Sequence, residues 1–273
     1  MKMTCKIAQI DKSTWRIDEP IGELHTYAYL LEGESRAMLI DTCQGLGDMA
    51  AAVHSLTAKP IFVAHTHGHL DHIGGDAGFE EVYLCPADLP VARAHSEPAF
   101  KRDMYARLEQ ERGLVFDAQT LEKLCLGVDT AKYRPMADGQ QFDLGGRIIQ
   151  VVSSPGHTIG SVCFYEAARR TLYTGDTVCA QGVLLSLPYA CSVQQFMHTI
   201  QKLRGMETQL DTLHPGHHEE PLAPEILKRY EACAAALLAG RLQGQPGESA
   251  GVPCLLAAQG NIGLAYNPDH ITD

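Results

Sequence analysis

Four histidines and an aspartate lie close together in one short stretch of this 273-residue chain. The segment 63–75, VAHTHGHLDHIGG, holds His65, His67, His69, Asp71 and His72 directly after an apolar run. Imidazole and carboxylate groups are the side chains that bind zinc and related divalent metals. A loop that leaves a strand can turn several such groups toward one point, and the two glycines after Ile73 permit a sharp turn. We therefore interpret this segment as a metal-binding loop rather than as a polar surface turn.

Three later segments repeat the same local order of apolar strand, tight turn and candidate ligand. His157 follows a strand expected at 147–153, Asp176 follows one at 170–174, and His214, His217 and His218 follow one at 208–213. One such turn would carry little weight, because an isolated histidine is usually a surface or core residue. Four of them in one chain predict ligands that gather at strand ends along one edge of a sheet.

The elements expected around these turns are short strands and helices. Apolar or alternating runs predict strands at 4–10, 25–32, 36–42, 60–65, 81–85, 140–145, 147–153, 161–166 and 170–175, and helices at 47–57, 193–204 and 221–240. Between 86 and 127 the pattern is helical, with Phe100, Met104, Tyr105 and Leu108 on one face. We expect one α/β domain over 1–273, made of two β-rich halves and a helical insertion at about 86–127.

Composition narrows the classes of function. The net charge is −11, which argues against a nucleic-acid partner. No apolar run reaches the roughly 20 residues of a membrane helix, and the first residues lack the pattern of a secretory signal. Nine cysteines without a CxxC pair argue against a disulfide framework and a structural zinc site. We expect a cytoplasmic protein that acts on a small molecule, without membrane or nucleic-acid partners; a homo-oligomer stays open.

The motif HGHLDH at 67–72 resembles the H-x-H-x-D-H motif of the metallo-β-lactamase-fold hydrolases. LIDT at 39–42, PGHT at 155–158, TGDT at 174–177 and PGH at 215–217 resemble the other motifs of that family, in their usual order. The resemblance implies an αββα four-layer sandwich with a dinuclear metal site at one edge. Carried over by position, it assigns His67, His69 and His157 to the first metal, Asp71, His72 and His217 to the second, and Asp176 to a bridge between them.

The same resemblance implies a hydroxide between the two metals as nucleophile, with Asp71 as the catalytic residue that orients it. The ions are expected to be zinc, with iron or manganese as alternatives. The implied reaction is hydrolysis of a small ester-like bond, with a thioester, lactone or carboxylic ester placed before a phosphodiester. Two alternatives stay open, an iron-dependent oxidoreductase of the same fold and a ligand-binding or regulatory protein with little turnover.

Departures from the family pattern bear on the substrate. Cys43 stands where the family usually has glycine. Asp176 stands where classical zinc β-lactamases usually have Cys or Ser, which argues against antibiotic hydrolysis. Val178 and Cys179 stand where the acyl-homoserine-lactone lactonases carry a tyrosine. In the insertion, Phe100, Met104 and Tyr105 are candidate substrate contacts, and the alternative is that this face packs on the body of the protein. His65 is interpreted either as a residue of the strand end or as a support for the ligands, and His95 is interpreted as structural or solvated.

Overall fold

The computed structural model describes residues 5–273 and divides them into two compact units. Unit 1 comprises residues 5–136 and 142–148, and unit 2 comprises residues 137–141 and 149–273. Residue 4, the first of the strand expected at 4–10, lies outside the described residues. The expectation of one domain over the whole chain stays a prediction.

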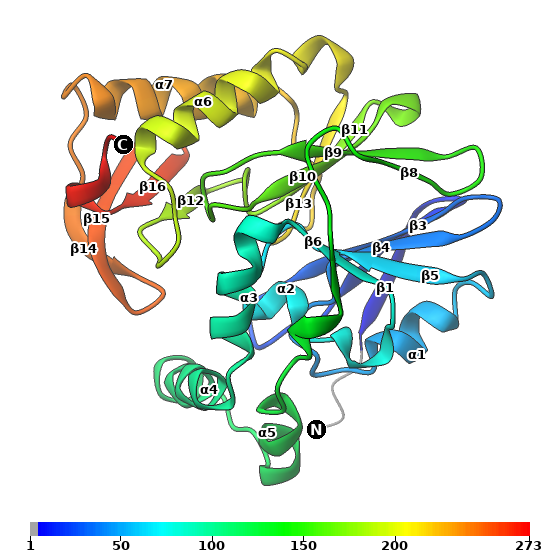
Figure 1. Ribbon diagram of the computed structural model, residues 1–273. Helices are drawn as coiled ribbons and strands as arrows, with labels where there is room; N and C mark the ends of the chain where they lie inside the picture. Colours follow the sequence, from blue (N-terminus) through cyan, green and yellow to red (C-terminus); the bar gives the residue numbers. More distant parts are fainter. Residues whose placement is uncertain (1–4) are drawn as a thin grey trace. The chain divides into compact units, whose positions relative to one another are not determined.

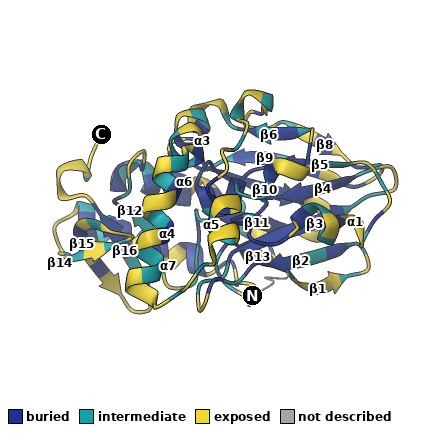
Figure 2. Ribbon diagram, turned by 90° about the horizontal axis from the view of Figure 1, so that it is seen from below, coloured by how far each residue is buried: buried dark blue, intermediate teal, exposed yellow. Residues whose placement is uncertain are grey.

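Unit 1 is built on a seven-stranded sheet in the order β1-β2-β3-β4-β5-β6-β7. Figure 1 shows β3, β4 and β5 of this sheet next to one another. Its strands are β1 Lys6–Asp11, β2 Thr14–Asp18, β3 Tyr27–Glu32, β4 Ala37–Ile40, β5 Ile61–Ala64, β6 Val82–Leu84 and β7 Tyr133–Pro135. The pairs from β1 to β4 are antiparallel, and those from β4 to β7 are parallel. Every residue of β4 is buried, as expected for an apolar strand in a parallel sheet, whereas β1 is an exposed edge (Figure 2).

Helices in unit 1 connect and cover these strands. They are α1 Met49–His54, α2 Leu70–Ile73, α3 Leu89–Ser96, α4 Pro98–Arg112 and α5 Ala118–Leu124. Met49 and Val53 of α1 pack in one hydrophobic cluster with Leu39 and Val63 of the sheet. The last three helices fill the insertion expected at 86–127. Proline occupies the first turn of α4, and Gly113 ends that helix at a φ of 63°.

Unit 2 carries most of two sheets, in the strand orders β13-β11-β10-β9-β8 and β12-β16-β15-β14. Residues 142–143 of β8 and residue 148 of β9 belong to unit 1. The strands are β8 Gln141–Asp143, β9 Ile148–Ser153, β10 Val162–Glu166, β11 Thr171–Gly175, β12 Gly182–Leu185, β13 Thr212–Pro215, β14 Gln245–Ser249, β15 Val252–Gln259 and β16 Ile262–Tyr266. Helices α6 Val193–Arg204 and α7 Ile226–Leu238 lie side by side (Figure 1). Phe196 of α6 and Tyr230 of α7 pack in one core cluster with apolar residues of both sheets.

The mixed α/β class is confirmed, but the sequence pattern missed several strands. These are β2, β7, β12 and the three C-terminal strands β14, β15 and β16. The strand expected at 208–213 begins only at Thr212, because residues 207–209 form a short 3-10 helix. The helix expected at 221–240 is shorter and begins at Ile226. Among residues 5–273, no helix has both the length and the apolar character needed to cross a bilayer.

Candidate metal centre

The loop that follows β5 in unit 1 carries the densest group of candidate ligands. His67 and His69 lie on the loop, and Asp71 and His72 lie on the short helix α2. All three histidines are buried, with relative exposures between 0% and 5%, whereas Asp71 is partly exposed. Buried imidazole rings need polar partners, so the local fold commits these side chains to specific interactions.

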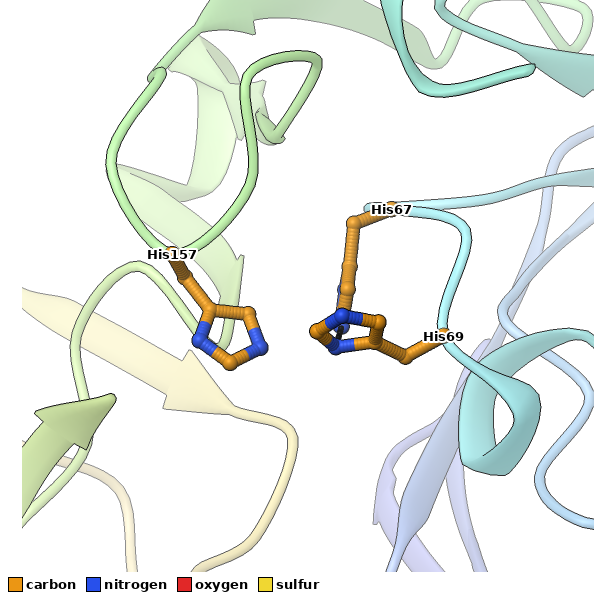
Figure 3. Close-up of side chains that lie close together, drawn as sticks. All are labelled: His67, His69 and His157. Carbon is orange, nitrogen blue, oxygen red and sulfur yellow. Dashed lines mark hydrogen bonds between the residues drawn. The ribbon is translucent and has the colours of Figure 1, made fainter. Parts of the chain in front are cut away.

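The ring nitrogens of this loop converge. His67 Nε2 lies 3.1 Å from His69 Nδ1, and Figure 3 shows these two rings brought together from one loop. The His72 ring centroid lies 4.1 Å from that of His67. Asp71 Oδ2 lies 3.8 Å from His72 Nε2. Nitrogen lone pairs that point into one small volume fit a cation, because a cation satisfies all of them at once.

Asp41, which directly follows β4, supports this loop through hydrogen bonds. Its Oδ1 accepts a hydrogen bond of 2.7 Å from the Thr66 amide, and its Oδ2 accepts one of 2.7 Å from the Thr66 hydroxyl. His72 Nδ1 lies 2.8 Å from the same Oδ2. Burial alone would raise the pKa of Asp41. The charge of His72 and hydrogen bonds from His65 and His72 outweigh burial, so the pKa lies below its usual value. An ionised Asp41 makes Nδ1 the donor nitrogen of His72 and leaves Nε2 as its ligand atom.

His65 pairs with Asp76, a partner that was missed from the sequence. His65 Nε2 lies 3.0 Å from Asp76 Oδ1, and both side chains are fully buried. Burial alone would lower the pKa of His65, but the Asp76 carboxylate outweighs it and the pKa rises to about 9. Asp76 also accepts hydrogen bonds of 2.8 Å from Thr42 Oγ1 and 2.6 Å from the Tyr133 hydroxyl. No local signal distinguishes Asp76, since these partners lie far away in sequence.

Unit 2 gathers its own three candidate ligands. His157 follows β9, Asp176 follows β11 and His217 follows β13. Asp176 Oδ2 lies 3.4 Å from His157 Nε2 and 3.2 Å from His217 Nε2. His157 Nδ1 lies 2.9 Å from the Leu184 carbonyl of β12, so it donates to that oxygen and leaves Nε2 as the ligand atom. Figure 3 shows His157 on its loop.

Comparison with known proteins decides the family. The model of the metallo-beta-lactamase superfamily matches residues 21–221, about three quarters of the chain. The chain belongs to the metallo-beta-lactamase superfamily. Within this superfamily it is an enzyme, a metal-dependent hydrolase with a candidate His/Asp metal site.

Curated relatives in this superfamily include thioesterases and zinc-dependent hydrolases. The chain is 25% identical to an acyl-coenzyme A thioesterase of Bos taurus over 214 residues, which cover 69% of this chain and 71% of the relative. It is also 25% identical to a probable polyketide biosynthesis zinc-dependent hydrolase of Bacillus velezensis over 193 residues, 70% of this chain and 72% of the relative.

Solved structures share the fold. A metallo-beta-lactamase from Pontibacter korlensis superimposes with a TM-score of 0.61 at 16% identity, covering 85% of this chain and 99% of that one. Another protein, solved in a di-iron-bound form, gives a TM-score of 0.56 at 25% identity and covers 77% of this chain and 96% of that one. These matches confirm the expected metallo-β-lactamase fold.

His214 and His218 lie beside His217, but the superfamily motif assigns neither of them to a metal. Both contact other groups of the protein. The His214 ring is buried and stacks on Tyr173, with centroids 5.3 Å apart. His218 Nδ1 lies 3.1 Å from the His217 carbonyl. His214 thus faces Tyr173 and His218 faces a backbone carbonyl, whereas the His217 side chain faces Asp176.

The backbone at Cys43 explains why the superfamily usually has glycine at this position. Its φ is 56°, in the left-handed region that glycine adopts without strain. The side chain is fully buried, and its thiol donates to the Thr26 carbonyl over 3.3 Å. The chain thus keeps the turn that glycine usually makes here and fills it with a packed thiol.

The apolar face of the insertion packs in unit 1. Tyr105 is fully buried in a cluster with Leu70 and Leu124, and Met104 packs against that cluster. Phe100 is half-buried, and its ring centroid lies 4.2 Å from that of His95. These contacts favour the packing interpretation for Met104 and Tyr105. Their assignment as substrate contacts, with Phe100, stays a prediction.

Proposed function

We propose that this enzyme holds two divalent metal ions and hydrolyses a small ester-like bond, with an acyl thioester as its substrate. The observation that carries the proposal is the way the ligand histidines are held. In His72 and His157 the Nδ1 atom faces an oxygen acceptor, a carboxylate in one case and a carbonyl in the other. Such partners fix the tautomer and orientation of metal-binding histidines.

The donor set fits two ions. His67, His69 and His157 would hold one ion, Asp71, His72 and His217 would hold the other, and Asp176 would bind both; each offers one ligand atom. The set contains five imidazoles and two carboxylates, which suits zinc and also iron. Zinc is the first choice because a relative is named a zinc-dependent hydrolase, and the di-iron-bound neighbour supports two ions and makes iron the alternative.

The reaction follows from these groups. Bound there, the ions would polarise the scissile carbonyl and bring the pKa of an attacking water toward neutrality. Asp71, whose side chain is 30% exposed, would use a carboxylate oxygen to accept a hydrogen bond from that water and hold its proton. The buried Asp41 would keep the Nδ1 proton of His72 in place while the carbon–sulfur bond of the thioester breaks.

An apolar groove in unit 2 supports an acyl substrate. It has a volume of about 370 Å³ on the sheet of β12, β15 and β16. Its lining includes Gly182, Leu184, Leu256, Ala258, Gly263 and Ala265. The carbonyl of Leu184 accepts the His157 hydrogen bond, so one residue both lines the groove and supports a proposed ligand. A surface of this kind suits a hydrocarbon chain.

The test is a substrate panel combined with metal analysis. The fully loaded protein is assayed on short- and long-chain acyl-coenzyme A thioesters, a lactone and a phosphodiester. We expect two metals per chain and the highest kcat/KM on a thioester. Leu256→Gln should raise KM for the long-chain thioester, while the exposed control Leu126→Gln should not. One metal at saturation, or turnover of only an oxidisable sulfur substrate, would overturn the proposal in favour of an oxidoreductase.

A further inference from the structure

The loop of unit 1 that carries His67 and His69, called the metal loop below, is supported by side chains outside the proposed ligands. Between His65 and Leu70 the chain leaves the sheet. Alternate backbone amides in this segment donate hydrogen bonds to side chains of other elements. The Thr66 amide donates to Asp41 over 2.7 Å, the Gly68 amide to Asp88 over 2.5 Å and the Leu70 amide to His95 over 3.2 Å. Two of these three acceptors come from the start of the insertion.

The insertion meets this loop at very close range. A Cβ atom on Gly68 would lie 2.7 Å from the backbone nitrogen of Ala92 in α3. A contact this close leaves no room for a side chain at position 68. The first helix of the insertion is therefore fitted against the loop that carries His67 and His69.

His95, in the last turn of α3, makes two contacts with this loop. Its Nδ1 accepts from the amide of Leu70, the first residue of α2, and helix α2 carries Asp71 and His72. The first amides of a helix have no partner within the helix, so an external acceptor fixes where the helix begins. The His95 ring also stacks on the His69 ring, with centroids 4.6 Å apart and planes 24° apart.

We propose that His95 is a positioning residue of the metal centre, acting on both proposed ions through different contacts. The stacked ring sets the orientation of His69, and the Nδ1 acceptor sets the start of the helix that presents Asp71 and His72. The Phe100 ring packs against His95 in turn, with centroids 4.2 Å apart. The inference rests on the proposed function, since it takes these residues as ligands.

Two conservative substitutions separate the two contacts. His95→Asn keeps an acceptor near the position of Nδ1 but removes the aromatic stack. His95→Phe keeps the stack but removes the acceptor. The control is His198→Ala, an exposed histidine on α6 in unit 2. Metal affinity is measured by competition with a chromophoric zinc chelator, and amide hydrogen exchange at Leu70 is measured on the metal-free protein.

We expect His95→Phe to speed exchange of the Leu70 amide, while His95→Asn keeps it protected. Either substitution should weaken zinc binding about 10-fold, and His95→Ala up to about 100-fold, the range known for groups that support metal ligands. Turnover by the zinc-saturated variants should fall in kcat with KM unchanged. The exposed control should match the wild type in all three measurements.

Two results would overturn the inference. Zinc affinity equal to the wild type in all three His95 variants would show that the contacts do not position ligands. A rise in KM with unchanged zinc affinity would make His95 a substrate contact instead. Failure of the proposed function looks different, since the wild type itself would then bind only one metal at saturation or turn over only an oxidisable sulfur substrate.

Discussion

Replacing Asp41 with asparagine should change the tautomer of His72 without changing the shape of the site. Asp41 accepts three short hydrogen bonds, two from Thr66 and one from His72, at 2.7, 2.7 and 2.8 Å. His65 Nδ1 lies farther away, 3.5 Å from Asp41 Oδ1. Asparagine offers one oxygen and one NH₂ group. The oxygen can keep the hydrogen bond from the Thr66 amide. The NH₂ group can donate to the Thr66 hydroxyl and to His72 Nδ1. The last bond requires that His72 Nδ1 loses its proton and Nε2 gains one.

The magnitude follows from these three bonds. A hydrogen bond to a charged group contributes about 1 kcal/mol more than a neutral one, so three of them cost up to about 3 kcal/mol of folding stability. Binding a metal through Nε2 forces the original tautomer back and leaves two donors facing each other in a buried site. That arrangement costs about 1–3 kcal/mol, which weakens the second metal about 5–150-fold.

The assay combines zinc competition, urea unfolding of the metal-free protein and the nitrogen NMR shifts of the His72 ring. The control is Asp103→Asn, which removes an exposed carboxylate on α4. We expect one zinc to bind as in the wild type and the second to bind more weakly in Asp41→Asn. If both bind with wild-type affinity while His72 keeps its Nδ1 proton, the orienting role assigned to Asp41 is wrong.

Three further predictions concern single side chains. Asp71→Asn should lower kcat about 10²–10⁴-fold, the range for loss of a positioned acid–base group, and near-normal kcat at full metal occupancy would contradict its role. Cys43→Gly should cost less than about 1 kcal/mol in urea unfolding, because relief of the positive φ offsets the lost burial; a cost above about 3 kcal/mol would show that packing decides this position. Burial raises the pKa of Glu19, although the Gly47 amide and its neighbours partly oppose this. The stability that Glu19 contributes is therefore present below its unfolded pKa of about 4.3 and is lost as the pH rises through the folded pKa. The urea midpoint of Glu19→Gln should therefore rise relative to that of the wild type as the pH increases. Parallel pH profiles of the two midpoints would refute this.

The candidate ligands could be read from the sequence because each follows its strand within a few residues. His157, Asp176 and His217 each stand just after an apolar run, so local pattern alone marks the turn. The supporting residues have no such signal. Asp88 meets Gly68 from 20 positions away and His95 meets Leu70 from 25, and neither belongs to a periodic pattern. Only the folded chain brings them together.

The missed strands have a different cause. β14 contains Pro246 and Gly247, which local propensity disfavours in strands, and most of its residues are not buried. β2 mixes buried and half-buried residues without regular alternation. In both cases pairing with a neighbouring strand overrides weak local preference, and that pairing is invisible in a short window of sequence.

The backbone of the metal loop takes part of its support from the start of the insertion. A segment that leaves a sheet loses its ladder partners, and a buried amide without an acceptor costs free energy. In the proposed site the histidine side chains of the loop bind metal, so the acceptors for these amides come from other elements. Asp41 at the end of β4 supplies one, and Asp88 and His95 of the insertion supply the other two. The first helix of the insertion is thus part of the metal loop's support, whatever the later helices do for the substrate.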